Sequence, residues 1–176
     1  VVWQLSMRMA LFRLHAGESL IRKARLDAVF PTWGQGQSAS ADVRAAEQEI
    51  ELEVSAVIGS MEVTWLEVGD EPSADSDRAY LERNLIALLA GSGGPLDLPS
   101  STWLGRYSGR EAIPFSGLWN VNHVYDDFDV SSLDVLERYV EASEGTRPPV
   151  EKSIAPKGWR ARALASGQRG KQFELL

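Results

Sequence analysis

The segment MEVTWLEV, residues 61–68, is the one stretch of this chain with the β-branched and aromatic composition of a β-strand. A lone strand would leave its backbone amides and carbonyls without partners, so it has to pair with neighbouring strands. Only weak candidates occur, around Val29 and Phe30 and in residues 118–124. Either these weak segments pair with it, or strands that normally complete the sheet are missing, and we favour the second. The sequence therefore predicts an α+β fold with a small sheet flanked by helices.

The helices are easier to place, because apolar residues recur with helical spacing over much of the chain. Four segments have this pattern: residues 1–24, 42–61, 73–91 and 131–145. The third is the best defined, with Ser73 or Ser76 as its N-cap and Gly91 at its end. We divide the chain into a domain, residues 1–144, and a basic, loosely ordered tail, residues 145–176.

Composition excludes several classes of protein. With 176 residues, 44% of them hydrophobic and 24% charged, the chain is suited to one globular domain. It contains no cysteine, which excludes disulfides and thiolate metal sites, and no apolar run that would span a membrane. No signal-peptide pattern occurs, so we expect a cytoplasmic protein.

The net charge of −7 is unevenly distributed along the chain. Residues 1–25 carry five Arg/Lys and one Glu, which gives +4, and residues 145–176 carry seven Arg/Lys and two Glu, which gives +5. Residues 41–90 carry three Arg and twelve Asp/Glu, which gives −9. The basic ends could bind a polyanion while central carboxylates hold a cation. The alternative is that the charges pair between segments.

Glu82 interrupts the apolar face of its predicted helix. At 100° per residue, Leu85, Ile86 and Leu89 lie within about 60° of it, so we expect its carboxylate near the centre of the buried face. Glutamate is almost never fully buried without a partner. The partner would be a metal, a proton or another cation, and Arg78, four residues earlier, is the simplest ion-pair candidate.

The segments on either side of Glu82 resemble the GIY-YIG nuclease superfamily. There, a metal-binding glutamate lies on a helix in a pattern like L-E-x-N-L-I, which reads LERNLI at residues 81–86. Other similar segments follow one another across residues 5–140: FRLHAGESLI, TWGQG, DRAYLERNLIALLA, PSSTWLG and SGLWNVNHV. Their order is more specific than the helix motif alone, because glutamate in a leucine-rich helix is common.

The resemblance implies metal-dependent hydrolysis of DNA phosphodiester bonds. Glu82 would hold one divalent cation, which polarises the scissile phosphate and stabilises the leaving oxygen. A hard oxygen ligand of this kind suits Mg²⁺ or Mn²⁺. In such enzymes a tyrosine from the amino-terminal strands activates the attacking water, and an arginine on the first helix stabilises charge at the phosphate.

The chain departs from the superfamily at those strands, since neither a GIY nor a YIG tripeptide occurs in it. Relatives carry them upstream of the point where this chain begins. We therefore expect a truncated GIY-YIG-like domain, about its carboxy-terminal two-thirds. No residue matches the catalytic tyrosine or arginine, and Arg8, Arg13 and Arg78 are retained as candidate DNA contacts.

Asn120, Asn122 and His123 are further candidates for nucleic-acid binding. In an extended stretch the two amides share a face and could orient a phosphate or a metal-bound water. Alternatively, both satisfy the backbone of a turn. His15 and His123 are the two histidines, and without a cluster they argue against zinc and favour a structural role for His123.

Aspartates 126, 127 and 129 could suggest calcium, but they lack the glycine and final glutamate of an EF-hand loop. Asp129 is more consistent with capping of the helix that follows. In the tail, basic residues and Trp159 could contact phosphates and an unpaired base, or the tail is simply solvated.

Two functions remain open from the sequence. The first is a cytoplasmic, DNA endonuclease-like protein that uses Mg²⁺ or Mn²⁺, with or without activity in this chain. The second is a non-catalytic remnant of such a domain that binds nucleic acid or protein.

Overall fold

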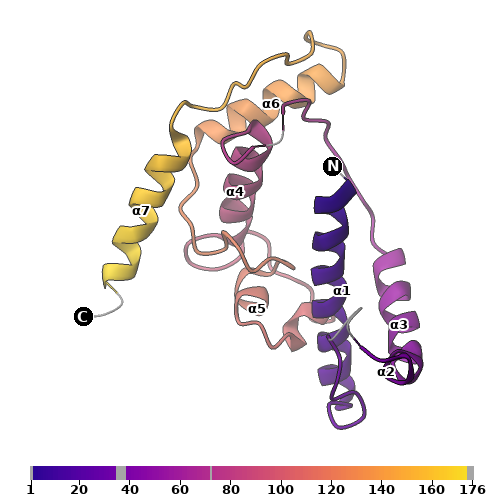
Figure 1. Ribbon diagram of the computed structural model, residues 1–176. Helices are drawn as coiled ribbons and strands as arrows, with labels where there is room; N and C mark the ends of the chain where they lie inside the picture. The colour runs from indigo at the N-terminus through magenta and orange to yellow at the C-terminus, as the bar shows by residue number, and fades with distance from the viewer. Residues whose placement is uncertain (1, 35–38, 72, 174–176) are drawn as a thin grey trace. The chain divides into compact units, whose positions relative to one another are not determined.

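The computed structural model describes residues 2–34, 39–71 and 73–173, and the side chains of residues 11–34, 39–71 and 73–166 (Figure 1). Among these residues the elements are α-helices and the 3₁₀ helix η2: α1 (Val2–Ala24), α2 (Ala41–Ala46), α3 (Gln48–Gly59), α4 (Asp77–Ala90), η2 (Leu104–Tyr107), α5 (Ala112–Ser116), α6 (Ser131–Ser143) and α7 (Trp159–Phe173). Across the described residues, every helix is too short or too polar to cross a lipid bilayer.

The predicted α+β fold is wrong, because no β-strand occurs among the described residues. Residues 61–68 form a loop without regular secondary structure, and their predicted partners form no strand either: Val29 lies in a turn, and residues 118–124 are a series of bends and turns. Without a neighbour, the segment makes no ladder. Val63 and Trp65 stay 83% and 79% exposed, whereas Leu66 and Val68 pack against the core cluster of unit 2.

The chain forms two compact units, and each is assembled from two separate stretches of sequence. Unit 1 comprises Val1–Val63 and Asp97–Val121, and unit 2 comprises Thr64–Leu96 and Asn122–Leu176. Helix α7 falls within residues 145–176, whose separation from the rest as a tail stays a prediction.

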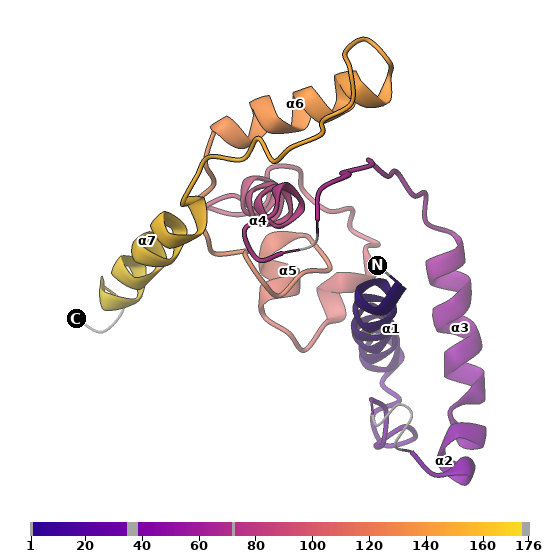
Figure 2. The ribbon, with the colours of Figure 1, turned by 45° about the horizontal axis from the view of Figure 1, so that its top comes forward.

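Unit 1 is organised around α1, which packs against α3 and η2 and lies beside α3 in both views (Figure 1, Figure 2). The helix runs through Gly17 without interruption. The absence of a side chain at this residue makes room for an aromatic ring. A Cβ at Gly17 would lie 2.0 Å from Trp33 Cζ2, so any side chain there would collide with the indole. Glycine at this position therefore permits close packing rather than a break.

Unit 2 is built on α4, which packs against α6. Ser76 caps α4, because its Oγ accepts a hydrogen bond from the Ala79 amide at 3.2 Å. The core cluster contains Tyr80, Leu81, Val135, Tyr139 and Trp159. The Trp159 ring meets the Tyr80 ring edge-to-face at 5.2 Å and is only 7% exposed, so it belongs to the core rather than to a base-stacking surface.

Asp77, in the first turn of α4, is completely buried and joins this helix to the chain after α6. Its carboxylate accepts hydrogen bonds from the Tyr139 hydroxyl at 2.8 Å and from the Ile154 and Ala155 amides, both at 2.9 Å. Ser153 Oγ is a fourth donor. Burial alone would raise the pKa of Asp77, but these donors stabilise the charged form and the net pKa is lowered.

Candidate nucleic-acid and metal site on helix α4

Glu82 projects from α4 on the side opposite to the core. The buried residues of the helix share the other face: Asp77, Tyr80, Leu81, Asn84, Ala87 and Ala90. At 100° per residue, Glu82 lies about 180° from the middle of that face, so the expectation that it sits at the buried centre is wrong. Tyr80 and Asn84 set the orientation of α4, because the Tyr80 ring and the Asn84 amide lie in the core. Glu82 is half-buried, and Leu89 beside it is 46% exposed.

Arg78 is held by the segment that precedes α4. Its guanidinium donates to the Val68 carbonyl at 2.8 Å and pairs with Asp70 Oδ1 at 3.4 Å. Asp70 Oδ2 also accepts from the Asp77 amide at 2.6 Å, so this carboxylate satisfies the first backbone amide of α4. These contacts give Arg78 a structural task, and its contact with DNA stays a prediction.

Arg83, the neighbour of Glu82, fastens the loop before α6. Arg83 Nε lies 3.0 Å from Asp126 Oδ2, and its Nη1 donates to the Asp127 carbonyl at 3.2 Å. His123 Nδ1 contacts the same Asp126 oxygen at 2.8 Å. The contact between Nδ1 and the Asp126 carboxylate orients the imidazole ring.

His123 adopts φ 64°, in the left-handed region that side chains rarely occupy. The bond to Asp126 and the Arg83 contact together hold this conformation. His123 thus has Asp126 as a side-chain partner, and its ring remains 38% exposed; its contact with DNA stays a prediction. Asn122 next to it is exposed and has no side-chain hydrogen bond to any described residue. Asn120, half-buried, belongs to unit 1, whereas Asn122 belongs to unit 2.

Asn84, in the LERNLI motif, is completely buried and has a role that the sequence did not suggest. Its Nδ2 donates to the Tyr80 carbonyl at 2.8 Å, and its Oδ1 accepts from the Asp129 amide at 2.7 Å. Asp129 Oδ1 in turn accepts from the Ser131 amide and hydroxyl at the first residue of α6, whose N-cap position is Val130. The Ser131 hydroxyl lowers the pKa of Asp129 despite its partial burial.

A small cavity of about 220 Å³ lies beside this hydrogen-bonded cluster. Its walls include Arg83 and Asn84 from α4, Asp129, and Trp159 and Arg162 from α7. Glu82 is not among its lining residues. The polar groups of this cavity are engaged in the bonds that fix α4, α6 and α7, so the cavity is a feature of unit 2 packing.

Of the two candidate arginines on α1, the structure describes the side chain of Arg13. Arg13 forms an ion pair with Glu51 and donates to Ser55 Oγ at 3.2 Å, which ties α1 to α3. The Arg8 side chain lies outside the described side chains. Contacts of either arginine with DNA stay predictions.

No group of three or more His, Asp or Glu side chains within the described residues could hold a metal ion. Mg²⁺ is commonly bound by one or two carboxylates, while water and substrate phosphate oxygens complete its coordination shell. Glu82, half-buried and on the non-core side of α4, fits the role of such a carboxylate.

Comparison with protein-family models gives one decisive match. A model described as GIY-YIG domain matches residues 6–146. The chain belongs to the GIY-YIG family. The matched range contains α4 with Glu82 and the loop that Arg83 holds, and the predicted resemblance is confirmed. No curated protein and no solved structure matches the chain.

Membership in the GIY-YIG family gives this chain a nuclease ancestry. GIY-YIG nucleases in general depend on divalent metal ions and act on DNA. Sequence reasoning missed the two buried polar residues of α4, Asp77 and Asn84. Their spacing of seven residues, two helical turns, was the available signal, because it places both on one face.

Proposed function

We propose that this GIY-YIG protein is a cytoplasmic, metal-dependent DNA endonuclease in which Glu82 is the ligand of one Mg²⁺ or Mn²⁺. The observation that carries the proposal is the position of Glu82 in the family-matched α4, on the side of the helix that faces away from the unit 2 core. A metal ligand in a nuclease has to be reached by a DNA phosphate, and a carboxylate in the core would not be.

The residues near Glu82 in the chain suit a site of this kind. Leu85 and Ile86 are half-buried on its side of α4, so the carboxylate stands in partly apolar surroundings, where its attraction for a cation is stronger than in bulk water. When bound, the ion would supply charge stabilisation at the scissile phosphate and leaving oxygen. The carboxylate itself fixes where that charge is placed.

The loop held by Arg83 supplies the further DNA contacts that we propose. Asn122 is an exposed amide that can donate to phosphate oxygens, and His123 presents Nε2 while Asp126 orients its ring. Arg83 follows Glu82 on α4 and bonds to Asp126 and Asp127, so it fixes the position of this loop relative to the helix.

A non-catalytic role is the second candidate. Neither the GIY nor the YIG tripeptide occurs in the 176 residues, and those motifs carry the tyrosine expected to activate water. A domain that keeps the helical scaffold without that tyrosine would bind nucleic acid or protein without cleaving it.

Plasmid nicking distinguishes the two candidates. The purified chain is incubated with supercoiled DNA in Mg²⁺, Mn²⁺ or EDTA, beside Glu82→Gln and a matched control, Glu137→Gln. Glu137 is an exposed glutamate on α6, so its substitution makes the same charge change away from the site. We expect metal-dependent nicking that Glu82→Gln lowers by at least about 100-fold and Glu137→Gln leaves intact. No nicking by the folded wild-type protein would favour the binding role.

A further inference from the structure

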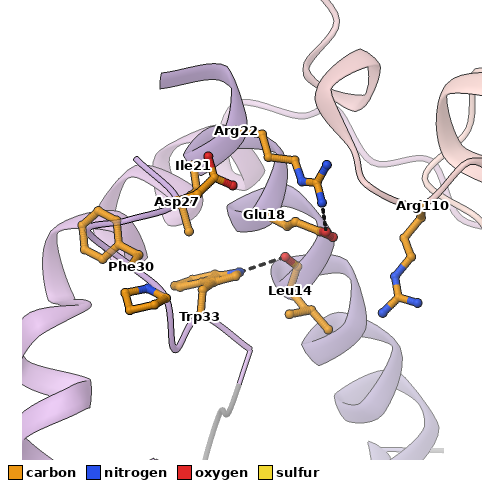
Figure 3. A pocket seen from close by; sticks show the side chains of 9 residues that line it. Leu14, Glu18, Ile21, Arg22, Asp27, Phe30, Trp33 and Arg110 are labelled. Atoms are coloured by element: carbon orange, nitrogen blue, oxygen red, sulfur yellow. Dashed lines mark hydrogen bonds and ion pairs between the residues drawn. The ribbon is translucent and has the colours of Figure 1, made fainter. Parts of the chain in front are cut away.

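Unit 1 contains a second and larger cavity, which no part of the proposed endonuclease site uses. It measures about 480 Å³ and lies between the carboxy-terminal half of α1, the turn that follows, and residue 110 (Figure 3). Pockets for small organic ligands usually occupy about 300–1,000 Å³. The volume is therefore sufficient for one nucleotide.

One wall of the cavity is aromatic and rigid. Trp33 and Phe30 lie on this side of the cavity (Figure 3). The Trp33 indole Nε1 donates to the Leu14 carbonyl at 3.0 Å, and its ring lies against Gly17 where a Cβ has no room. A ring fixed in this way offers a flat surface to a planar ligand at little conformational cost.

The opposite side carries positive charge. Arg110 lines the cavity, is exposed, and its guanidinium has no hydrogen bond or ion pair with any described residue. Arg22, in contrast, pairs with Glu18 at 3.4 Å. A Cβ at Gly109 would lie 2.4 Å from Arg22 Nη2, so the backbone that carries Arg110 is pressed against α1.

The field of Arg110 reaches the interior beneath the cavity. His15 is 6% exposed, and burial followed by the charge of Arg110 lowers its pKa. Glu18 offsets the charge of Arg22, so among the described residues that line the cavity Arg110 is the cation available to a ligand. Asp27, also exposed at the cavity, has no side-chain partner among the described residues and can accept from a ligand amino or hydroxyl group.

We propose that this cavity binds one unpaired nucleotide, with its base stacked on Trp33 and its phosphate on Arg110. A rigid aromatic face across a cavity from a guanidinium that has no partner among the described residues suits a base and its phosphate in a single strand. The proposal rests on the proposed function insofar as the nucleotide belongs to DNA. A free nucleoside monophosphate presents the same chemistry, and the experiment separates these two sources.

Fluorescence anisotropy of a labelled single-stranded oligonucleotide tests the site. Glu82→Gln protein in EDTA is the background, because it prevents cleavage and makes the result independent of the endonuclease proposal. Arg110→Gln is the test variant and Arg44→Gln the matched control, since Arg44 is an exposed arginine of unit 1 outside the cavity. We expect at least tenfold weaker binding for Arg110→Gln and less than a twofold change for Arg44→Gln.

The dependence of affinity on salt adds a readout that a merely structural residue would not change. Loss of one phosphate contact lowers the slope of log K against log salt by about 0.7 for a single strand. Trp33→Phe keeps an aromatic ring and should bind within a few-fold of wild type, whereas Trp33→Leu should lose roughly tenfold. A folded Arg110→Gln protein with unchanged affinity and slope would overturn the proposal.

Competition with deoxyadenosine monophosphate identifies the source of the nucleotide. Displacement of the oligonucleotide by the free nucleotide shows that a mononucleotide is sufficient for the cavity. Failure to compete, with the Arg110 dependence intact, assigns the cavity to a nucleotide within a strand. Single-strand binding that neither Arg110→Gln nor the free nucleotide changes would contradict both sources.

Discussion

The side-chain oxygen of Asn84 accepts a hydrogen bond from the backbone amide of Asp129 at 2.7 Å, across 45 positions of sequence. The Asn84 side-chain nitrogen, Nδ2, donates to the Tyr80 carbonyl, so Asn84 is buried with both its oxygen and its nitrogen hydrogen-bonded. It connects α4 to the start of α6, and thereby holds the loop that contains His123 at a fixed distance from the helix.

Substitution of Asn84 by alanine should destabilise unit 2. The Asp129 amide would lose its acceptor in a part-buried position, which costs about 1–3 kcal/mol of unfolding free energy. Urea denaturation measures the change. Asn122→Ala is the control, since Asn122 is exposed, and its effect should stay within about 0.5 kcal/mol. Equal stability of the two variants would contradict this role for Asn84.

Replacement of Asp77 by asparagine should be at least as costly. The carboxylate accepts from four donors, and an amide can offer only one oxygen to them. We expect a loss of about 1–3 kcal/mol for each donor left unpaired, seen as a lower guanidinium midpoint. Asp75→Asn, an exposed neighbour, should unfold like the wild-type protein. A midpoint unaffected by Asp77→Asn would show that the buried carboxylate is dispensable.

The stability of unit 2 should depend on pH through the same residue. The pKa of Asp77 is below its ordinary value of 3.8, so its contribution is full above that value and is lost as the pH falls through the folded pKa. Burial, and after it the bond to Asp77, raise the pKa of Tyr139 above 10.0, so that contribution is full below pH 10 and is lost at more alkaline pH. Denaturation midpoints should therefore be level between these limits, and Asp77→Asn should flatten the acid side.

Loss of the Arg83 guanidinium should loosen the loop before α6. Arg83→Met removes the pair with Asp126 and the donor to the Asp127 carbonyl, and the amides of residues 123–129 should exchange faster with solvent. Arg83→Lys should fall between the two proteins, because an ammonium cannot reproduce the planar fork. Hydrogen exchange followed by mass spectrometry is the measurement, and protection that is the same in all three proteins would refute the link.

Two helical glycines should respond to alanine in opposite directions. Gly17→Ala places a Cβ 2.0 Å from the Trp33 ring and should destabilise unit 1. Gly59→Ala meets nothing within 4 Å and should stabilise the protein by about 0.5–1 kcal/mol, because alanine loses less backbone entropy. Thermal unfolding of both variants checks the signs, and a stabilising Gly17→Ala would show that Trp33 does not pack there.

Helices α1, α4 and α6 were predictable because their signals are local, whereas α7 lies in the segment that we expected to be loosely ordered. Ser76 and Gly91 flank α4 in sequence as they do in space, and the apolar spacing of α6 is contained within one segment. The family was also predictable, since the LERNLI motif and its neighbours follow one another in order. These features require no knowledge of distant contacts.

The errors came from features that depend on distant partners. Composition marks residues 61–68 as strand-forming, but a strand exists only where another one pairs with it, and none does among the described residues. The buried face of α4 was misplaced because leucines were taken as its centre. Asp77 and Asn84 lie near that centre. Their spacing of seven residues places both on one face, but their bonds to residues 154 and 129 depend on distant parts of the chain.

The interleaving of the two units has a consequence for how the chain folds as it is synthesised. Residues 64–96 of unit 2 leave the ribosome before residues 97–121 can complete unit 1. The Asp77 carboxylate then waits for Ser153, 76 positions later, to supply a donor. Every contiguous fragment that contains all of one unit also contains part of the other. Neither unit can therefore be produced alone by truncating the chain.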